Sequence, residues 1–162
     1  MSAEKVVYNF LDNLNIQYEI TNHPPVFTIE EANAIDKLHI GHGCKNLFLK
    51  DRKGSRYFLI VLSKDKHANL KDIQKKLEST PLTFASEEKL YTYLKLTKGS
   101  VTPLGILNDI DHKVELVFDR DIINEAHLGF HPNINTATIW ISFDDLQKVV
   151  QECGNQTYII DI

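Results

Sequence analysis

Hydrophobic residues recur at intervals of three and four positions in several parts of the chain, which is the spacing of one face of a helix. The first such stretch carries Val6, Val7, Phe10, Leu11 and Leu14. Thr28 and Glu31 have the spacing of a capping box, and Asn69 and Ser142 are N-cap residues ahead of later apolar periods. Helices are therefore predicted over residues 2–14, 29–38, 69–77, 86–94 and 143–153, the last ending at Gly154.

Other stretches are continuously apolar or alternate between apolar and polar positions, as strands do. The runs 45–51 and 56–63 flank a glycine-containing turn, which predicts a β-hairpin. The unbroken apolar run 57–62 predicts a central strand covered on both faces. Further strands are predicted over residues 16–20 and 113–119, within the strand–turn–strand segment 127–142, and over residues 156–162.

Helices and strands are interspersed along the chain, and no internal repeat, low-complexity tract or linker separates them. Because several strands are joined by hairpins, the sheet should be mixed rather than purely parallel. A length of 162 residues suits one domain with a sizeable core. We therefore expect a single α/β domain over residues 1–162, with a mixed sheet flanked by helices.

Composition places the chain among cytoplasmic proteins. No apolar run approaches the ~20 residues that cross a bilayer. The first residues have neither the basic lead nor the apolar block of a signal peptide. The two cysteines, Cys44 and Cys153, give no disulfide framework. These features predict a cytoplasmic protein without a membrane partner.

Charge is distributed unevenly along the chain. The net charge is −4, yet residues 45–76 hold ten Lys or Arg against three acids, a local charge of +7. The remainder holds 8 basic and 19 acidic residues, a charge of −11. A basic region on an acidic protein can steer a polyanion to one face. The alternative is that these lysines only solvate a helix and a hairpin turn.

The common signatures of catalysis are missing from the sequence. It contains no G-x-S-x-G elbow, no P-loop and no H-E-x-x-H motif. His39 and His42 lie near Cys44, but no second Cys/His pair stands at the spacing that zinc requires. A partly buried thiol is a more common role for such a cysteine than a nucleophile. We therefore predict no metal and no organic cofactor.

Three segments combine glycine with hydrogen-bonding residues, and each abuts a predicted strand: 41–46, 99–105 and 129–138. Loops at strand ends commonly converge on one site. The middle segment contains Pro103 between two glycines, so it is either a plain connection or a shaped backbone surface that holds a ligand. Lys45 opens an otherwise apolar strand, which makes it either an exposed surface lysine or a functional ammonium group.

Together these segments resemble the free-standing prolyl-tRNA editing domains, also called the YbaK or prolyl-tRNA-synthetase-associated domain family, and most closely the branch that removes alanine from proline tRNA. The matching segments, in the expected order, are HPPVFTIEEA (23–32), KNLFLKD (45–51), GSVTPLGILND (99–109) and GFHPNINTATIWIS (129–142). The resemblance implies a strongly curved mixed sheet, aminoacyl-tRNA deacylase activity and tRNA as the partner, with no DNA and no cofactor. It leaves a partnership with prolyl-tRNA synthetase open.

The resemblance also implies roles for individual residues. Lys45 would contact the 3′-terminal phosphate or the ester oxygen as a point charge. Gly99 and Ser100 would join it as catalytic residues, because backbone N–H groups of a G-x-x-x-P loop can polarise the ester carbonyl. The remaining substrate-binding candidates are Val101, Thr102, Pro103, Gly129, His131, Asn135 and Thr136. The tRNA-binding candidates are Lys50, Arg52, Lys53, Lys64 and Lys66, and the side chains placed in the amino-acid pocket are Ile29, Phe48 and Leu104.

An aminoacyl ester is already activated, and family members are thought to recruit the tRNA 2′-hydroxyl, so no catalytic triad is expected. His131 either orients water or packs. A small pocket that accepts alanine would discriminate poorly against serine, since such differences are worth only ~1–3 kcal/mol. Two alternatives stay open: a deacylase for cysteinyl-tRNA(Pro), and a non-catalytic tRNA-binding module.

Overall fold

The computed structural model describes residues 1–25, 28, 30–31, 34 and 41–162. Its strands form one mixed, eight-stranded sheet in the order β1-β7-β6-β2-β3-β5-β8, with β4 paired to β2 outside that path. The strands are β1 (Glu19–Asn22), β2 (His42–Lys50), β3 (Tyr57–Ser63), β4 (Thr83–Phe84), β5 (Val114–Asp119), β6 (Leu128–Phe130), β7 (Ala137–Ile141) and β8 (Thr157–Ile160). The predicted α/β class with a mixed sheet is confirmed.

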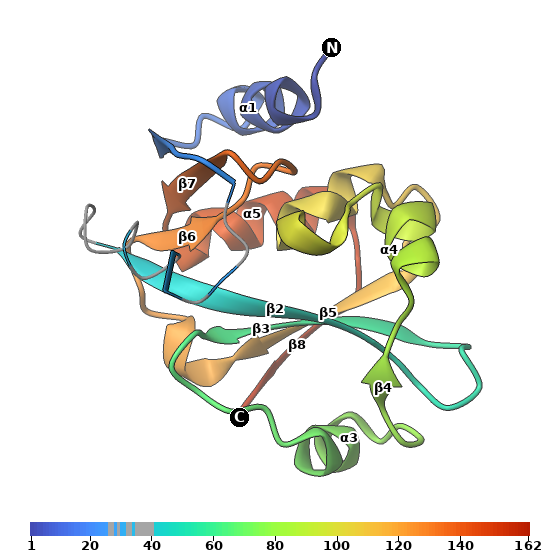
Figure 1. Ribbon diagram of the computed structural model, residues 1–162. Helices are drawn as coiled ribbons and strands as arrows, with labels where there is room; N and C mark the ends of the chain where they lie inside the picture. The colour runs from blue at the N-terminus through green and yellow to red at the C-terminus, as the bar shows by residue number, and fades with distance from the viewer. Residues whose placement is uncertain (26–27, 29, 32–33, 35–40) are drawn as a thin grey trace.

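Helices lie on both sides of this sheet (Figure 1). The α-helices are α1 (Ala3–Asn13), α3 (Leu70–Leu77), α4 (Glu87–Leu94) and α5 (Phe143–Cys153). Three 3₁₀ turns follow strands or helices: η1 (Lys98–Ser100), η2 (Pro103–Asn108) and η3 (Arg120–Ile122). No described helix is long and apolar enough to cross a membrane.

The predicted helix caps form as the sequence indicates. The side chains of Asn69, Ser86 and Ser142 each accept a backbone N–H at the start of α3, α4 and α5. Gly154 ends α5 with a left-handed φ of 86°. Most of the helix predicted over 29–38 lies outside the described residues, but the Thr28 hydroxyl oxygen accepts the Glu31 N–H at 3.1 Å.

The β2–β3 hairpin is confirmed, and β3 is its buried member. The two strands are antiparallel, with Phe48 opposite Leu59, and every residue of β3 is buried. On its other edge β3 pairs with β5 in parallel. The carboxylate of Asp51 stabilises the turn by accepting the Ser55 N–H at 2.8 Å and the Ser55 hydroxyl at 2.7 Å.

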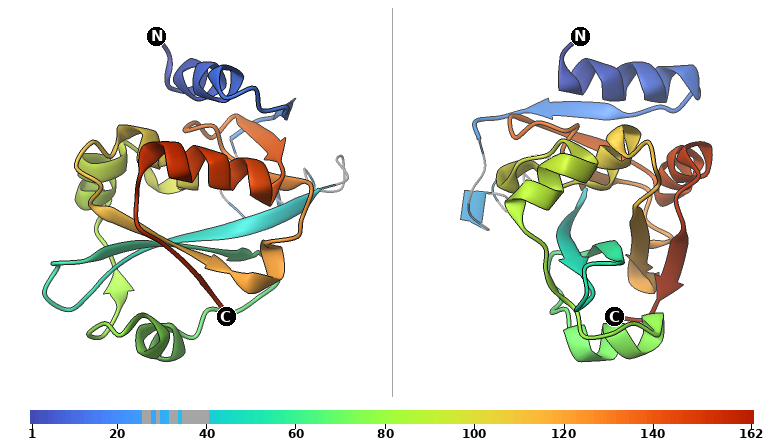
Figure 2. Two further views of the ribbon diagram at one scale, coloured as in Figure 1. Left: turned by 180° about the vertical axis from the view of Figure 1, so that it is seen from behind. Right: turned by 90° about the vertical axis from the view of Figure 1, so that its right-hand side faces the viewer.

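Alternation along β2 and β3 divides the buried side chains between two cores. Phe48, Leu59 and Val61 pack with α1, α4, α5 and η2 in the larger core, on what we call the α5 face. Leu49 and Phe58 pack with α3 in the smaller core, on the α3 face. The two further views show α5 and α4 on one side of these strands and α3 on the other (Figure 2).

Two predictions near the start of the chain need correction. Val6 was placed on the buried face of the first helix, but it is 40% exposed, while Val7 and Leu11 are buried. The strand predicted over 16–20 begins later, at Glu19, because the chain reverses at Asn15, whose φ is 58°.

Candidate functional site

Lys45 lies on β2 with its side chain on the α3 face. Its antiparallel partner Leu62 belongs to the α3-face core, and paired residues in a ladder point to the same side of a sheet. The Lys45 ammonium is half-buried and donates a hydrogen bond to the backbone carbonyl of Lys66 at 2.5 Å. An ammonium has three donors, so two N–H groups of Lys45 have no protein partner among the described residues.

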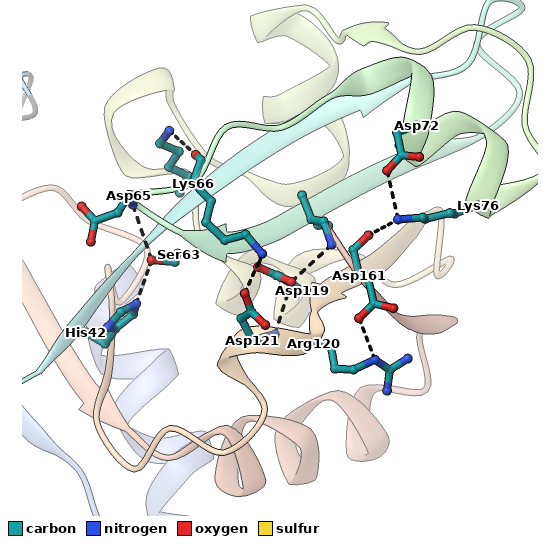
Figure 3. Close-up of polar contacts among 12 residues, drawn as sticks. His42, Ser63, Asp65, Lys66, Asp72, Lys76, Asp119, Arg120, Asp121 and Asp161 are labelled. Atoms are coloured by element: carbon teal, nitrogen blue, oxygen red, sulfur yellow. Dashed lines mark hydrogen bonds and ion pairs between the residues drawn. The ribbon is translucent and has the colours of Figure 1, made fainter.

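The turn after β3 is held against the start of β2. The Lys66 N–H bonds the Ser63 carbonyl at 3.0 Å, and the Lys64 N–H bonds the Gly43 carbonyl at 3.1 Å. The His42 ring Nε2 lies 2.8 Å from the Ser63 hydroxyl (Figure 3). The carbonyl that receives Lys45 is therefore part of a well-connected turn.

The Gly99–Pro103 loop runs from the end of η1 into the start of η2. Ser100 is buried, and its hydroxyl donates to the Thr97 carbonyl at 3.2 Å. The Thr102 hydroxyl oxygen accepts the Leu104 N–H at 3.3 Å, and Pro103 opens η2, where its missing N–H costs nothing. The role predicted for Ser100 uses its backbone N–H, and its hydroxyl is engaged in this bond to Thr97.

The predicted pocket-lining residues belong mainly to the core. Leu104 has no exposed surface, so its assignment to an open amino-acid pocket is wrong. Phe48 is also buried, and its ring stacks on Tyr57 with centroids 5.8 Å apart. The sequence-based assignment of Phe48 and Leu104 to the pocket failed because these apolar side chains, although close to polar loops in the sequence, point into the hydrophobic core. Ile29 lies outside the described residues.

His131 sits on the loop between β6 and β7 in a polar cluster that the sequence only partly revealed. Its Nδ1 donates to the Ala137 carbonyl at 3.0 Å, and its ring centroid lies 6.0 Å from that of His23. The His23 Nε2 in turn lies 2.9 Å from the Thr138 hydroxyl. Burial lowers the pKa of His131 below its ordinary value, so the ring is neutral at pH 7 with Nε2 as an acceptor.

Asn133 connects two of the three predicted loops. Its backbone is left-handed, with a φ of 62°, and its side-chain amide donates to the Leu104 carbonyl at 3.4 Å. The backbone carbonyl of Thr136 accepts the His23 N–H at 3.0 Å. The structure therefore brings residues 129–138 beside the 99–105 loop, as the sequence predicted.

Gly129 and Trp140 are cross-strand partners, and the indole lies over the glycine. A Cβ added at Gly129 would stand 2.6 Å from the Trp140 Cζ3 atom, and one added at Gly41 would stand 2.2 Å from it. Trp140 is 2% exposed, and its indole N–H donates to the Thr21 hydroxyl at 3.0 Å. The structure thus gives Gly129 a packing role. The pairing of a single tryptophan with two glycines was not apparent from the sequence.

Lys45 and Gly129 lie on the same side of the sheet, whereas Val101 of the 99–103 loop packs on the α5 face, as do Leu128 and Phe130 of β6. The parallel pair Gly43 and Gly129 places the side of Lys45 in register across β2 and β6, and Lys45 is two residues beyond Gly43. Among the described residues no hydrogen bond or ion pair joins Lys45 to residues 99–103, so a ligand that contacts both would have to reach across the start of β2.

The basic segment 45–76 separates into two groups in the structure. Lys64 and Lys66 lie at the same end of the hairpin as Lys45, while Arg52 and Lys53 occupy the turn at its other end. Lys45 and Arg52 are seven residues apart along the chain, which corresponds to about 23 Å at ~3.3 Å per residue. Lys66 already forms ion pairs with Asp119 and Asp121 at 2.8 and 2.7 Å.

The described residues contain no group of three His, Cys, Asp or Glu side chains placed to hold a metal ion. The site is therefore built from an ammonium, a neutral imidazole and polar backbone. This combination can stabilise negative charge and orient an ester.

The comparisons with known proteins identify the class. Residues 23–149 match the aminoacyl-tRNA editing domain. The chain belongs to this family, as its resemblance to prolyl-tRNA editing domains implied. The matched range includes Lys45, the 99–105 loop and His131.

Individual relatives support the same family assignment. The chain is 45% identical over 162 residues to "Prolyl-tRNA editing protein ProX" of Acetoanaerobium sticklandii, covering 100% of this chain and 99% of that protein. It is 37% identical over 155 residues to "Prolyl-tRNA synthetase associated domain-containing protein 1" of Mus musculus, covering 93% and 91%. A crystal structure described as a candidate trans-editing enzyme for prolyl-tRNA synthetase superposes with a TM-score of 0.73 at 16% identity, covering 99% and 96%. The last likeness supports the fold.

Proposed function

We propose that this chain is a trans-acting deacylase that hydrolyses the ester of alanyl-tRNA(Pro). The observation that carries the proposal is the full-length similarity to the ProX editing protein, at 45% identity. The polar site described above supports it, because it offers charge and backbone dipoles where an ester could be held. Prolyl-tRNA synthetase remains a proposed partner of the tRNA-bound protein.

The proposed chemistry uses positioning and electrostatics. The 99–103 loop backbone would polarise the ester carbonyl, and Lys45, across the start of β2, would contact the 3′-terminal phosphate of the same tRNA end. A water molecule, oriented by the 2′-hydroxyl of the terminal adenosine, would attack the carbonyl carbon. The ester C–O bond would then break, releasing alanine and the tRNA hydroxyl group. His131 is neutral and can accept a proton or hydrogen bond through Nε2. Holding ester and water in the reactive geometry supplies several further kcal/mol.

A panel of charged tRNA(Pro) substrates tests the proposed selectivity. We expect rapid release of alanine, slower release of serine, and no hydrolysis of prolyl-tRNA(Pro), because a small pocket excludes the pyrrolidine ring but barely resolves alanine from serine. The measurement is single-turnover hydrolysis of each radiolabelled substrate, corrected for spontaneous ester hydrolysis. Preferential release of cysteine would replace alanine as the substrate. Absence of any release would favour a tRNA-binding module.

Arg52 and Lys53, at the hairpin turn, are proposed to contact phosphates of the acceptor stem. Replacing both with glutamine should raise the KM for tRNA and leave kcat unchanged, because the turn lies far from Lys45. The slope of log KM against log salt should fall by about 1 for each lost phosphate contact. Lys148→Gln is the matched control, since it removes a cation that pairs with Asp145 on α5. An unchanged slope in the double variant would remove these two residues from the interface.

A further inference from the structure

Asp119 is a carboxylate buried at the end of β5, and its partners come from distant parts of the chain. Its side chain is 1% exposed, and one oxygen lies 2.8 Å from the Lys66 ammonium. The other oxygen accepts the Asp121 N–H at 3.2 Å and the Ile162 N–H at 3.4 Å. A buried carboxylate is tolerated only when it is paired in this way, so Asp119 fixes the position of the Lys66 side chain.

The Lys66 ammonium is paired with two carboxylates. Asp121 provides a second carboxylate at 2.7 Å, on the side of the ammonium that faces solvent. The contact with the Asp119 carboxylate and then that with Asp121 raise the pKa of Lys66 above its ordinary value, so it stays charged. Figure 3 shows the Lys66 side chain directed toward these two carboxylates. Its charge is therefore balanced within the protein.

The backbone of the same residue carries the carbonyl that receives Lys45. The side chain of Lys66 is anchored on β5 and η3, and its carbonyl bonds the Lys45 ammonium. We propose that the Lys66–Asp119 ion pair is a positioning device that fixes the direction of the Lys45 ammonium. This inference rests on the proposed function, in which Lys45 contacts the substrate. Lys66 then acts through Lys45 rather than as a phosphate ligand.

The two roles of Lys66 predict opposite kinetics. A phosphate ligand contributes to tRNA affinity, so its loss raises KM and reduces the salt dependence of binding. A positioning residue fixes the geometry of the reacting groups, so its loss lowers kcat and leaves KM unchanged. A substitution at Lys66 keeps the backbone carbonyl that accepts the Lys45 hydrogen bond but removes the side-chain ion pairs that hold this carbonyl in position.

The test compares Lys66→Gln, Lys66→Arg and Arg120→Gln in deacylation of alanyl-tRNA(Pro). Lys66→Gln should lower kcat roughly tenfold or more, since small displacements of a reacting group carry losses up to about 100-fold, with unchanged KM. Lys66→Arg should recover most of kcat, because a guanidinium can pair with both carboxylates. Arg120→Gln is the matched control. Arg120 lies between Asp119 and Asp121 in the sequence, is 53% exposed and pairs with Asp161. This variant should retain wild-type kcat.

The kinetics of Lys66→Gln and the rescue by Lys66→Arg can each contradict the positioning role. A raised KM with wild-type kcat in Lys66→Gln would overturn it in favour of a phosphate contact, and so would failure of arginine to restore kcat. If Lys66→Gln does not fold, Asp121→Asn is the alternative variant, because it weakens the same ion-pair cluster at a 70% exposed carboxylate. It should lower kcat by a smaller factor, and an unchanged kcat would overturn the inference.

Lys45→Ala distinguishes the proposed function from the positioning role of Lys66. Full activity of Lys45→Ala refutes the proposed role of Lys45. An inactive Lys45→Ala together with a fully active Lys66→Gln refutes only the positioning role of the Lys66–Asp119 ion pair.

Discussion

Replacing Lys45 with alanine is expected to lower kcat/KM for alanyl-tRNA(Pro) by roughly 100- to 1,000-fold, the usual result of removing one preorganised donor from developing negative charge. The fold should survive, because the side chain is half-buried and its one hydrogen bond to the described residues goes to a backbone carbonyl. The β2–β3 ladder is made by main-chain groups. Single-turnover kinetics measure the first effect, and thermal unfolding measures the second.

Lys45→Arg and Lys148→Ala complete that experiment. Arginine keeps the charge but replaces a compact ammonium with a wider planar group, so it should restore only part of the rate. Lys148 is an exposed lysine of α5 that pairs with Asp145, and its loss should leave the rate unchanged. Hydrolysis by Lys45→Ala at the wild-type rate would show that this ammonium takes no part in the reaction.

Gly129→Ala is expected to destabilise the protein by about 2–3 kcal/mol, as overpacking of a filled site does. The added methyl group would stand 2.6 Å from the Trp140 ring and cannot be accommodated without moving the indole. The ring is 2% exposed and held by a bond to Thr21. At 2–4 °C per kcal/mol for a domain of this size, the melting temperature should fall by roughly 5–10 °C. Differential scanning calorimetry measures the shift.

Trp140→Phe tests whether contact with the indole causes the loss of stability in Gly129→Ala. Phenylalanine at position 140 lacks the outer part of the indole, where the contact with Gly129 occurs. Trp140→Phe should therefore reduce the further destabilisation caused by Gly129→Ala, giving a favourable coupling free energy in the double-mutant cycle. Simple additivity of the two substitutions would mean that steric contact with the indole is not the cause. Lost activity in a Gly129→Ala protein of normal stability would restore its predicted role in substrate binding.

Much of the fold could be predicted because its signals are local. The side chains of Asn69, Ser86 and Ser142 each accept the backbone N–H of the residue three positions later, so helix starts are encoded in short stretches. The hairpin turn is likewise closed by contacts between Asp51 and Ser55. The first strand was misplaced because its position depends on pairing with β7, more than a hundred residues away.

The site was harder to predict because its geometry depends on long-range register. The sequence singled out Lys45, His131 and the 99–105 loop, and the structure shows that the last two adjoin through Asn133. The side of the sheet occupied by Lys45 follows from strand pairing. The ion pair of Lys66 with Asp119 joins residues from the ends of β3 and β5, and no local pattern marks it. Basic residues were therefore counted as tRNA ligands before their acidic partners could be known.

Strand β2 pairs with β6, β3 and β4, and the change from β6 to β3 occurs at Cys44, one residue before Lys45. His42 and Gly43 pair with β6, whereas Cys44 and the residues that follow pair with β3. The lysine thus stands at a seam between the half of the molecule that carries the β6–β7 loop and the half that carries the basic hairpin. Under the proposed function, substitutions in the β6–β7 half would alter the preference for the amino acid, and substitutions in the hairpin half would alter the preference for the RNA.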